Sequence, residues 1–322
     1  MKFTTEHKQL IRQHWAKPLL RFLTKQFGQK LIYLGLPSPE TEDVLEWLEY
    51  LRIIIAFQCD DERYPDAYSI LFEKLAALER QGQIESFQAY RGYIEKVILQ
   101  GRDENIGANS QTFNLGEVVT LYNLDFCNSV DSPLEFLDDD GDYHTVYKFD
   151  AVKKLLEIQE RLSDISSKFV LFLTVHCSFR GGELESYLAD CPYKEYVKTV
   201  RSSLKSHDKN ARIVRLFVLD ALQGYFRSFR FIPKVLPTIF YQGLGSTYLL
   251  HFTILGTRCN SPGPAPWLQD FSTLIQSKFV TPGENSFINL TIDDITEHDL
   301  EDINPVSIVA ASRTFKKYWK SK

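Results

Sequence analysis

The stretch KVLPTIFYQGLGSTYLLHFTILG, residues 234–256, decides the fold of this chain. It has the pattern of two apolar strands joined by a Gly-Leu-Gly-Ser turn. Gly243 and Gly245 allow the positive φ angles that a tight hairpin needs. The pair follows a long series of alternating strand and helix patterns. We therefore expect a parallel α/β sheet that closes with an antiparallel hairpin near its C-terminal end.

Apolar runs upstream predict the other strands of this sheet. The runs at 30–35 and 52–58 are unbroken, as in parallel strands that are covered on both faces. A weaker strand pattern covers 83–93. One mostly parallel sheet is predicted from strands at 30–35, 52–58, 117–124, 168–176 and 234–242. The strand at 247–256 is predicted to lie antiparallel beside 234–242.

Helical spacing of apolar residues predicts helices between these strands and at both ends of the chain. Residues 4–27 form an amphipathic pattern of one helix or a helix pair, and 267–278 and 306–319 predict peripheral helices. The fold class is α/β, with a Rossmann-like doubly wound sheet. The predicted organisation is an N-terminal helical extension over 1–29, a domain over 30–256 with a hairpin insertion at about 134–149, and a C-terminal linker with peripheral helices over 257–322.

Composition narrows the functional classes. The net charge is −5, so the whole surface is not that of a nucleic-acid-binding protein, although a local basic face stays open. The five cysteines are widely spaced and contain no C-x-x-C pair, which argues against a disulfide framework and a cysteine metal site. We expect reduced thiols, a cytoplasmic protein, no metal and no membrane span.

Three loops follow the predicted strands at the edge where open α/β sheets bind ligands. They are Gly35-Leu36-Pro37-Ser38-Pro39-Glu40, Gln58-Cys59-Asp60-Asp61-Glu62 and Asn123-Leu124-Asp125-Phe126-Cys127-Asn128. Polar residues inside an otherwise apolar strand cost stability unless they are paired, so Asn123 and Asp125 are candidate site residues.

The order of elements over roughly 30–256 resembles the class I S-adenosylmethionine-dependent methyltransferase fold. The resemblance implies that Gly35 and Ser38 lie at the cofactor's amino-acid part, although the usual G-x-G-x-G is absent and two prolines stiffen the loop. It also implies that a carboxylate after the second strand binds the ribose hydroxyls. Asp60 or Asp61 is favoured, and Glu62 is an alternative, because a carboxylate accepts two hydrogen bonds from a cis-diol.

The same resemblance places Asn123, Asp125 and Phe126 opposite the transferred methyl group, as the catalytic positions. The segment is loosely similar to the Asn/Asp-Pro-Pro-aromatic motif of amino-methylating enzymes, without its prolines. The implied activity is methyl transfer from S-adenosylmethionine to a nitrogen or oxygen of a macromolecule. The glycine-poor first loop fits an atypical cofactor pose, and it equally fits an inactive member that acts as a binding or interaction module.

Two further interpretations stay open. One is a different α/β nucleotide enzyme, such as a hydrolase, although no G-x-S-x-G or P-loop sequence occurs. The other is a Cys/His nucleophile or metal pair at His176 and Cys177, which are more often buried structural residues.

A basic stripe suggests a polyanionic partner. Lys194, Lys198, Arg201 and Lys205 are spaced four, three and four residues apart, which places them on one helix face. Arg212 and Arg215 follow nearby, and the terminal segment Arg313–Lys322 is also basic. The stripe predicts contacts with nucleic acid phosphates or a protein partner, and the alternative is a solvated helix face.

Overall fold

The computed structural model describes residues 5–105, 110–138, 141–164, 167–178, 182–203, 206–260 and 263–282. The predicted helix at 306–319, the basic segment Arg313–Lys322 and Lys205 of the basic stripe lie outside these residues. The predicted helix at 267–278 is present as α10 (Phe271–Gln276).

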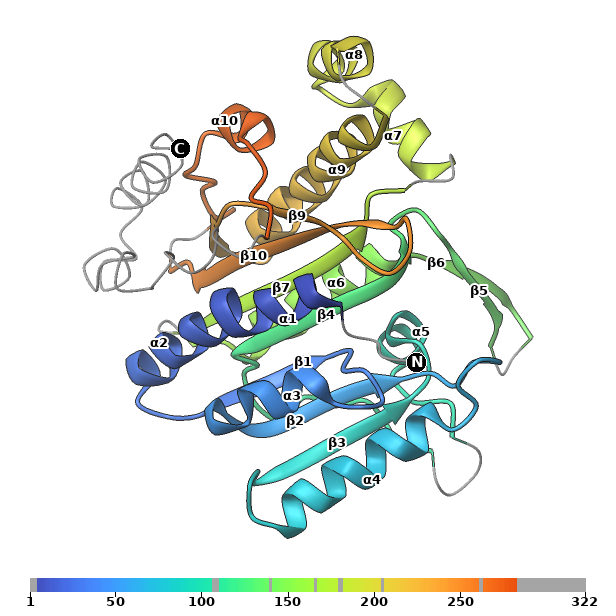
Figure 1. Cartoon of the computed structure of the whole chain (residues 1–322), viewed down its shortest axis with the longest axis vertical. Helices are drawn as coiled ribbons and strands as arrows, with labels where there is room; N and C mark the ends of the chain where they lie inside the picture. The colour runs from blue at the N-terminus through green and yellow to red at the C-terminus, as the bar shows by residue number, and fades with distance from the viewer. Residues whose placement is uncertain are drawn as a thin grey trace.

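A central sheet of eight strands runs through the described residues (Figure 1). Its strands are β1 (Leu31–Gly35), β2 (Leu51–Gln58), β3 (Ser86–Arg91), β4 (Leu121–Ser129), β7 (Lys168–His176), β8 (Phe231–Val235), β9 (Ile239–Gln242) and β10 (Tyr248–Arg258). All of the predicted strand positions carry strands, including the weaker one at 83–93. The strand expected from residue 117 begins four residues later, at Leu121.

The strand order is β3-β2-β1-β4-β7-β10-β8, with β9 also paired to β10. The first five strands are parallel, and β10 runs antiparallel to both β7 and β8. The chain thus has a doubly wound, mostly parallel sheet into which one reversed strand is inserted near the edge. This confirms the predicted fold class and the predicted direction of the closing strand.

The closing hairpin differs in detail from the prediction. Residues 234–242 do not form one strand, because the chain breaks between β8 and β9 around Pro237. Proline has no N–H to donate to a strand ladder. Both pieces pair antiparallel with β10. In the turn, the N–H of Gly243 donates to the carbonyl of Thr247 at 2.7 Å, and Gly245 adopts the positive φ, 65°, that the turn requires.

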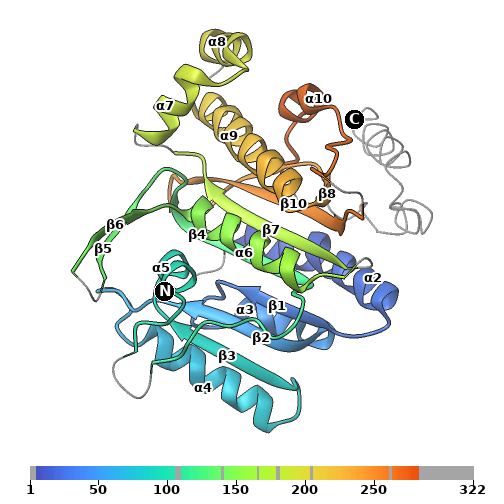
Figure 2. The same ribbon diagram turned by 180° about the vertical axis from the view of Figure 1, so that it is seen from behind.

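Helices cover both faces of the sheet (Figures 1 and 2). One face carries a continuous N-terminal helical segment together with α3 and α4, and the other carries α5, α6 and α9. The first set is α1 (Glu6–Leu10), η1 (Ile11–Ala16), α2 (Lys17–Phe27), α3 (Glu42–Trp47), η2 (Leu48–Tyr50) and α4 (Ala67–Arg80). The second set is α5 (Ile94–Gln100), α6 (Lys148–Leu162) and α9 (Ser206–Ser228), and α9 is flanked by α7 (Glu183–Asp190), α8 (Lys194–Ser203) and α10.

The N-terminal segment is part of the core. Thr5 caps its start, and Gly28, with a φ of 64°, ends it. Between these ends Trp15, Leu19 and Leu20 are buried in the same cluster as sheet residues of β1, β7 and β10. The middle stretch, η1, has π-helical hydrogen bonding, which is rare and frequently occurs at functional sites.

The predicted hairpin insertion is also present. Strands β5 (Leu134–Leu137) and β6 (Tyr143–Val146) form a separate two-stranded sheet. This hairpin follows β4, extends beyond the central sheet and leads into α6 (Figure 1). In the described part of the chain, no helix is both long enough and apolar enough to cross a membrane.

Candidate functional site

Strand β1 ends at Gly35, beside the first half of β4, which continues to Ser129. Gly35 is the register partner of Asn123, and the N–H of Leu36 donates to the carbonyl oxygen of Asn123 at 3.0 Å. A Cβ on Gly35 would lie 2.5 Å from that oxygen and 2.6 Å from the hydroxyl of Tyr33. The glycine therefore has a packing role between β1 and β4, besides any part in approaching a cofactor.

Asn123 belongs to a buried polar network that the sequence did not predict. Its Nδ2 donates to Asp43 Oδ2 at 2.5 Å and to the Tyr33 hydroxyl at 3.3 Å, and that hydroxyl donates to Asp43 at 2.7 Å. Burial, together with the negative charge of Asp43, raises the pKa of Tyr33 well above its usual value. Asp43 lies in the first turn of α3. A carboxylate there is stabilised by the helix dipole, so the sequence alone did not mark Asp43 as a site residue.

Two polar atoms near this network lack partners. Asp43 Oδ1 and Ser38 Oγ are buried, and neither forms a hydrogen bond within the described residues. Ser38 belongs to the connection from β1 to α3, which also contains the buried Pro37, and Asp43 follows in the first turn of α3. Buried polar atoms are normally paired, so these two can accept or donate to a bound molecule or an ordered water.

The acidic residues after β2 are already engaged with the chain. Asp60 accepts from the backbone N–H of Tyr68 at 2.8 Å and from Arg91 Nε at 2.9 Å. Asp61 accepts from the backbone of Arg63 and Tyr64, which closes its own turn. A carboxylate has about four acceptor positions, so Asp60 keeps capacity for a further donor. The structure leaves the ribose role of either residue a prediction.

Asp125 lies on β4, two residues beyond Asn123, and forms an ion pair with Lys8 of α1. Its negative charge also acts on Tyr241, His176 and His251, which the structure brings close to it. Burial lowers the pKa of His176 and raises that of Tyr241 well above its usual value. The sequence pattern did not single out Lys8, Tyr241 or His251, because they come from segments far away in the chain.

A chain of buried hydrogen bonds continues from this point beneath the N-terminal segment. Trp15 Nε1 donates to Thr253 Oγ1 at 2.8 Å. That hydroxyl lies 3.3 Å from His251 Nε2, and His251 Nδ1 lies 3.0 Å from Thr174 Oγ1. Full burial lowers the pKa of His251 to about 4, and the nearby charge of Asp125 opposes this change.

The remaining predicted residues are placed apart from this cluster. Phe126 is buried in the core on the opposite face of the sheet, among the residues that pack against α5 and α6. Its catalytic role stays a prediction. Cys177 is buried and burial raises the pKa of its thiol, so the group stays protonated and is a poor nucleophile. Within the described residues, no three His, Cys, Asp or Glu side chains could together hold a metal ion.

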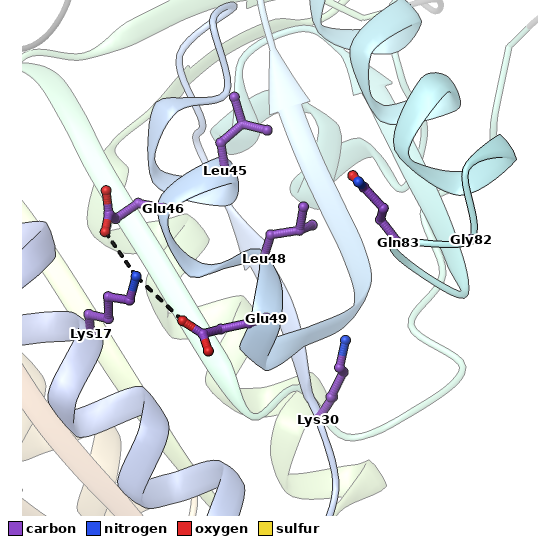
Figure 3. A pocket seen from close by; sticks show the side chains of 8 residues that line it. All are labelled: Lys17, Lys30, Leu45, Glu46, Leu48, Glu49, Gly82 and Gln83. Carbon is purple, nitrogen blue, oxygen red and sulfur yellow. Dashed lines mark hydrogen bonds and ion pairs between the residues drawn. The ribbon is translucent and has the colours of Figure 1, made fainter.

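A shallow pocket lies at the other edge of the sheet (Figure 3). Its lining includes Lys30, which precedes β1, and Gln83, which precedes β3, so it faces the amino ends of the strands. Lys17 crosses it to reach Glu46 at 3.2 Å and Glu49 at 3.4 Å. The pocket is therefore separate from the cluster around Asn123 and Asp125.

The basic stripe is exposed on α8. Lys194, Lys198 and Arg201 all reach solvent, and Arg201 pairs with Glu185 at 3.0 Å. Arg215, which the sequence added to this region, is instead fully buried and binds the carbonyls of Ile275 and Ser277. The surface charge near the stripe is therefore lower than the sequence alone suggests.

Comparisons with known proteins find solved structures that are similar to this chain only at low sequence identity and low TM-score. No family model and no curated protein matches the chain. An O-methyltransferase from Bacillus cereus in complex with SAH is 12% identical, with 76% of this chain and 80% of that chain covered and a TM-score of 0.36. The YcgJ protein from Bacillus subtilis is 9% identical, with 75% and 98% covered and a TM-score of 0.36.

Another similar structure, a candidate hemolysin from Streptococcus thermophilus, is 10% identical, with 95% of this chain and 76% of that chain covered and a TM-score of 0.37. At such scores the likeness carries no weight of its own. The fold is assigned from the strand order and strand directions of this chain. An open sheet of parallel strands with one antiparallel strand inserted before the last is the class I methyltransferase fold, and this chain has that fold.

Proposed function

We propose that this chain is an S-adenosylmethionine-dependent methyltransferase that acts on a nitrogen or oxygen of a macromolecule. The supporting observation is the sheet itself, in which the reversed β10 lies between β7 and β8. Gly35, at the end of β1, lies beside Asn123 of β4, and Asp125 follows two residues later. Asp60 comes just after the end of β2, the other neighbour of β1. In open α/β sheets, ligands bind at this edge.

The residues at this edge have the donor and acceptor types that the cofactor needs. The unpaired oxygen of Asp43 is an acceptor for the ammonium group of its amino-acid part, and Ser38 Oγ can bind the neighbouring carboxylate. Asp60 or Asp61 would accept from the ribose hydroxyls. When bound, the cofactor supplies an electrophilic methyl group.

The chain's own residues would position the acceptor. Asn123 is held rigidly by Asp43 and Tyr33, and Asp125 projects from the same face of β4 because strand side chains alternate. Asp125 would accept a hydrogen bond from the acceptor atom and take its proton. Holding the two reactants in line supplies much of the rate in such transfers.

The second candidate function is a binding module that keeps the fold without the chemistry. Three observations favour it. Gly35 is packed against protein atoms, Pro37 is buried in the first loop, and Lys8 covers Asp125. Each of these contacts fills space that an active site would leave for ligands.

Calorimetric titration with S-adenosylmethionine and with its demethylated product tests the proposal. We expect saturable binding of both, weakened by Asp60→Ala or Asp61→Ala, because one of these carboxylates binds the ribose. Asp66→Ala is the matched control, since Asp66 is exposed after the same loop. No binding by the folded parent chain would refute the methyltransferase proposal. Binding without transfer to any acceptor would favour the binding module.

A nucleic-acid partner, bound through the exposed cations of α8, is a further part of this proposal. Reversing Lys198 and Arg201 to Glu should abolish binding of DNA or RNA, and Arg80→Glu on the distant α4 should not (Figure 1). For the parent, the slope of log affinity against log salt should be about −0.9 for each DNA phosphate that it neutralises. If the double variant binds as the parent does, the stripe is a solvated helix face.

A further inference from the structure

The ion pair between Lys8 and Asp125 lies within the candidate active site. Lys8 Nζ donates to Asp125 Oδ2 across 117 residues of sequence, and the two side chains are 21% and 28% exposed. An ammonium group from within the chain is thus paired with the Asp125 carboxylate, in the middle of β4. We propose that Asp125 is a binding subsite for a primary ammonium group, that Lys8 occupies it from within the chain, and that the acceptor is an amine on a flexible alkyl chain.

The surroundings of Asp125 favour a cation over a neutral or anionic group. Among the described residues its charge acts on Tyr241, His176 and His251, and the cations Arg12 and Lys148 act on Tyr241 and His176 as well. Burial keeps both histidines neutral at physiological pH by lowering the pKa of each, and it keeps the tyrosine protonated. Asp125 is therefore a negative charge near three neutral titratable rings, and an ammonium group complements it electrostatically, as Lys8 does.

The position of Lys8 on α1 indicates that the bound group is an alkyl amine. Helix α1 is held against the closing hairpin, because His7 Nδ1 lies 3.0 Å from the carbonyl oxygen of Gln242. His7 also contacts the ring of Tyr241 edge-on. From this helix the four-carbon arm of Lys8 delivers its ammonium to Asp125. A lysine side chain of another protein has the same shape and charge.

This inference rests on the proposed function, because it names the acceptor class of the same site. In the transfer, the bound ammonium would give its proton to Asp125, and the freed nitrogen lone pair would form the N–C bond. The sulfonium–carbon bond of S-adenosylmethionine would break with its electron pair left on sulfur, so that a neutral thioether leaves. Lys8 must first move away, so the N-terminal segment would compete with the acceptor.

Butylamine is a suitable probe because it carries the alkyl ammonium group of lysine, and butanol is its uncharged counterpart. Lys8→Met removes the internal ammonium and keeps the length of the side chain. It should bind butylamine at least about ten-fold more tightly than the parent does. The affinity for butanol should not increase in Lys8→Met. The double variant Lys8→Met, Asp125→Asn should no longer bind butylamine. Lys17→Met is the control, because Lys17 pairs with Glu46 and Glu49 at the other edge.

The unchanged chain gives an independent measurement that needs no variant to fold. In nitrogen-edited spectra, the side-chain ammonium signal of Lys8 should shift on titration with butylamine and not with butanol, while that of Lys17 stays unchanged. A Lys8 signal indifferent to butylamine, or a Lys8→Met protein that binds butanol equally well, overturns the subsite. Neither titration contains S-adenosylmethionine. Amine binding without cofactor binding would therefore refute the methyltransferase function while keeping the subsite.

Discussion

The buried imidazole of His251 should make the fold sensitive to mild acid. The hydrogen bonds around it suit the neutral ring. Trp15 donates to the oxygen of Thr253, so the Thr253 hydroxyl is free to donate to Nε2, and Nδ1–H can donate to Thr174. A proton added at Nε2 would face that hydroxyl oxygen, which already accepts from Trp15. The charged ring would also lie out of contact with water, which is the larger cost.

The size of the effect follows from the two pKa values of His251. Its pKa is about 4 in the folded chain and 6.5 in the unfolded one. Because the folded value is the lower one, this contribution to stability is complete above the unfolded pKa and is lost as pH falls towards the folded pKa. Between about pH 7.5 and about pH 5, the free energy of unfolding should fall by about 2 kcal/mol from this group alone.

Urea unfolding of the parent and of His251→Gln at these two pH values measures the effect. The glutamine keeps hydrogen-bonding atoms near Thr174 and Thr253 but does not titrate. Other titrating groups are common to both proteins and cancel, so the acid-induced loss should be about 2 kcal/mol smaller in the variant. An equal acid-induced loss in His251→Gln and in the parent would refute the assignment.

Two further substitutions test the packing that holds the site and its surroundings. Gly35→Ala should lower the free energy of unfolding by about 1–3 kcal/mol in a urea titration, because its Cβ would lie 2.5 Å from the backbone oxygen of Asn123. The control is Gly116→Ala, whose Cβ would meet open space, and it should change the free energy of unfolding by less than about 0.5 kcal/mol. Arg215→Lys should lower the free energy of unfolding by about 1–3 kcal/mol and speed amide hydrogen exchange over 271–278, because an ammonium group cannot span the acceptors on Ile275 and Ser277. Arg227→Lys, at an exposed position, should change neither the stability nor the exchange. Unchanged unfolding of Gly35→Ala, or unchanged exchange in Arg215→Lys, would contradict these packing roles.

The sheet was predictable because its signals are local. Unbroken apolar runs predicted β1, β2 and β7, and the Gly243-to-Ser246 turn predicted the reversed β10. The break at Pro237 was also visible in the sequence, since proline cannot donate to a ladder. The sequence did not show that β10 pairs with β7 as well as with its hairpin partner, because non-adjacent pairing depends on the packing of the whole sheet.

The candidate site was predictable only in part. The two-residue period of a strand places Asn123 and Asp125 on one face, and the same period places Phe126 on the other, which could have been read from the sequence. No comparable rule pairs Lys8 with Asp125, because a side chain's partner across 117 residues is set by where its helix docks.

Asp43 shows most clearly why the sequence predicted only part of the candidate site. In the sequence it is one of several carboxylates in a predicted helix, and the dipole at the helix start explains it fully. In the structure it is buried against Tyr33 and Asn123, and one of its oxygens has no partner in the described residues. The cost of that burial must be offset by a donor outside these contacts. Asp43→Asn would place an amide where an ammonium is expected to bind, so it should weaken S-adenosylmethionine binding more than Asp66→Ala does, and equal affinities would leave only a structural role for Asp43.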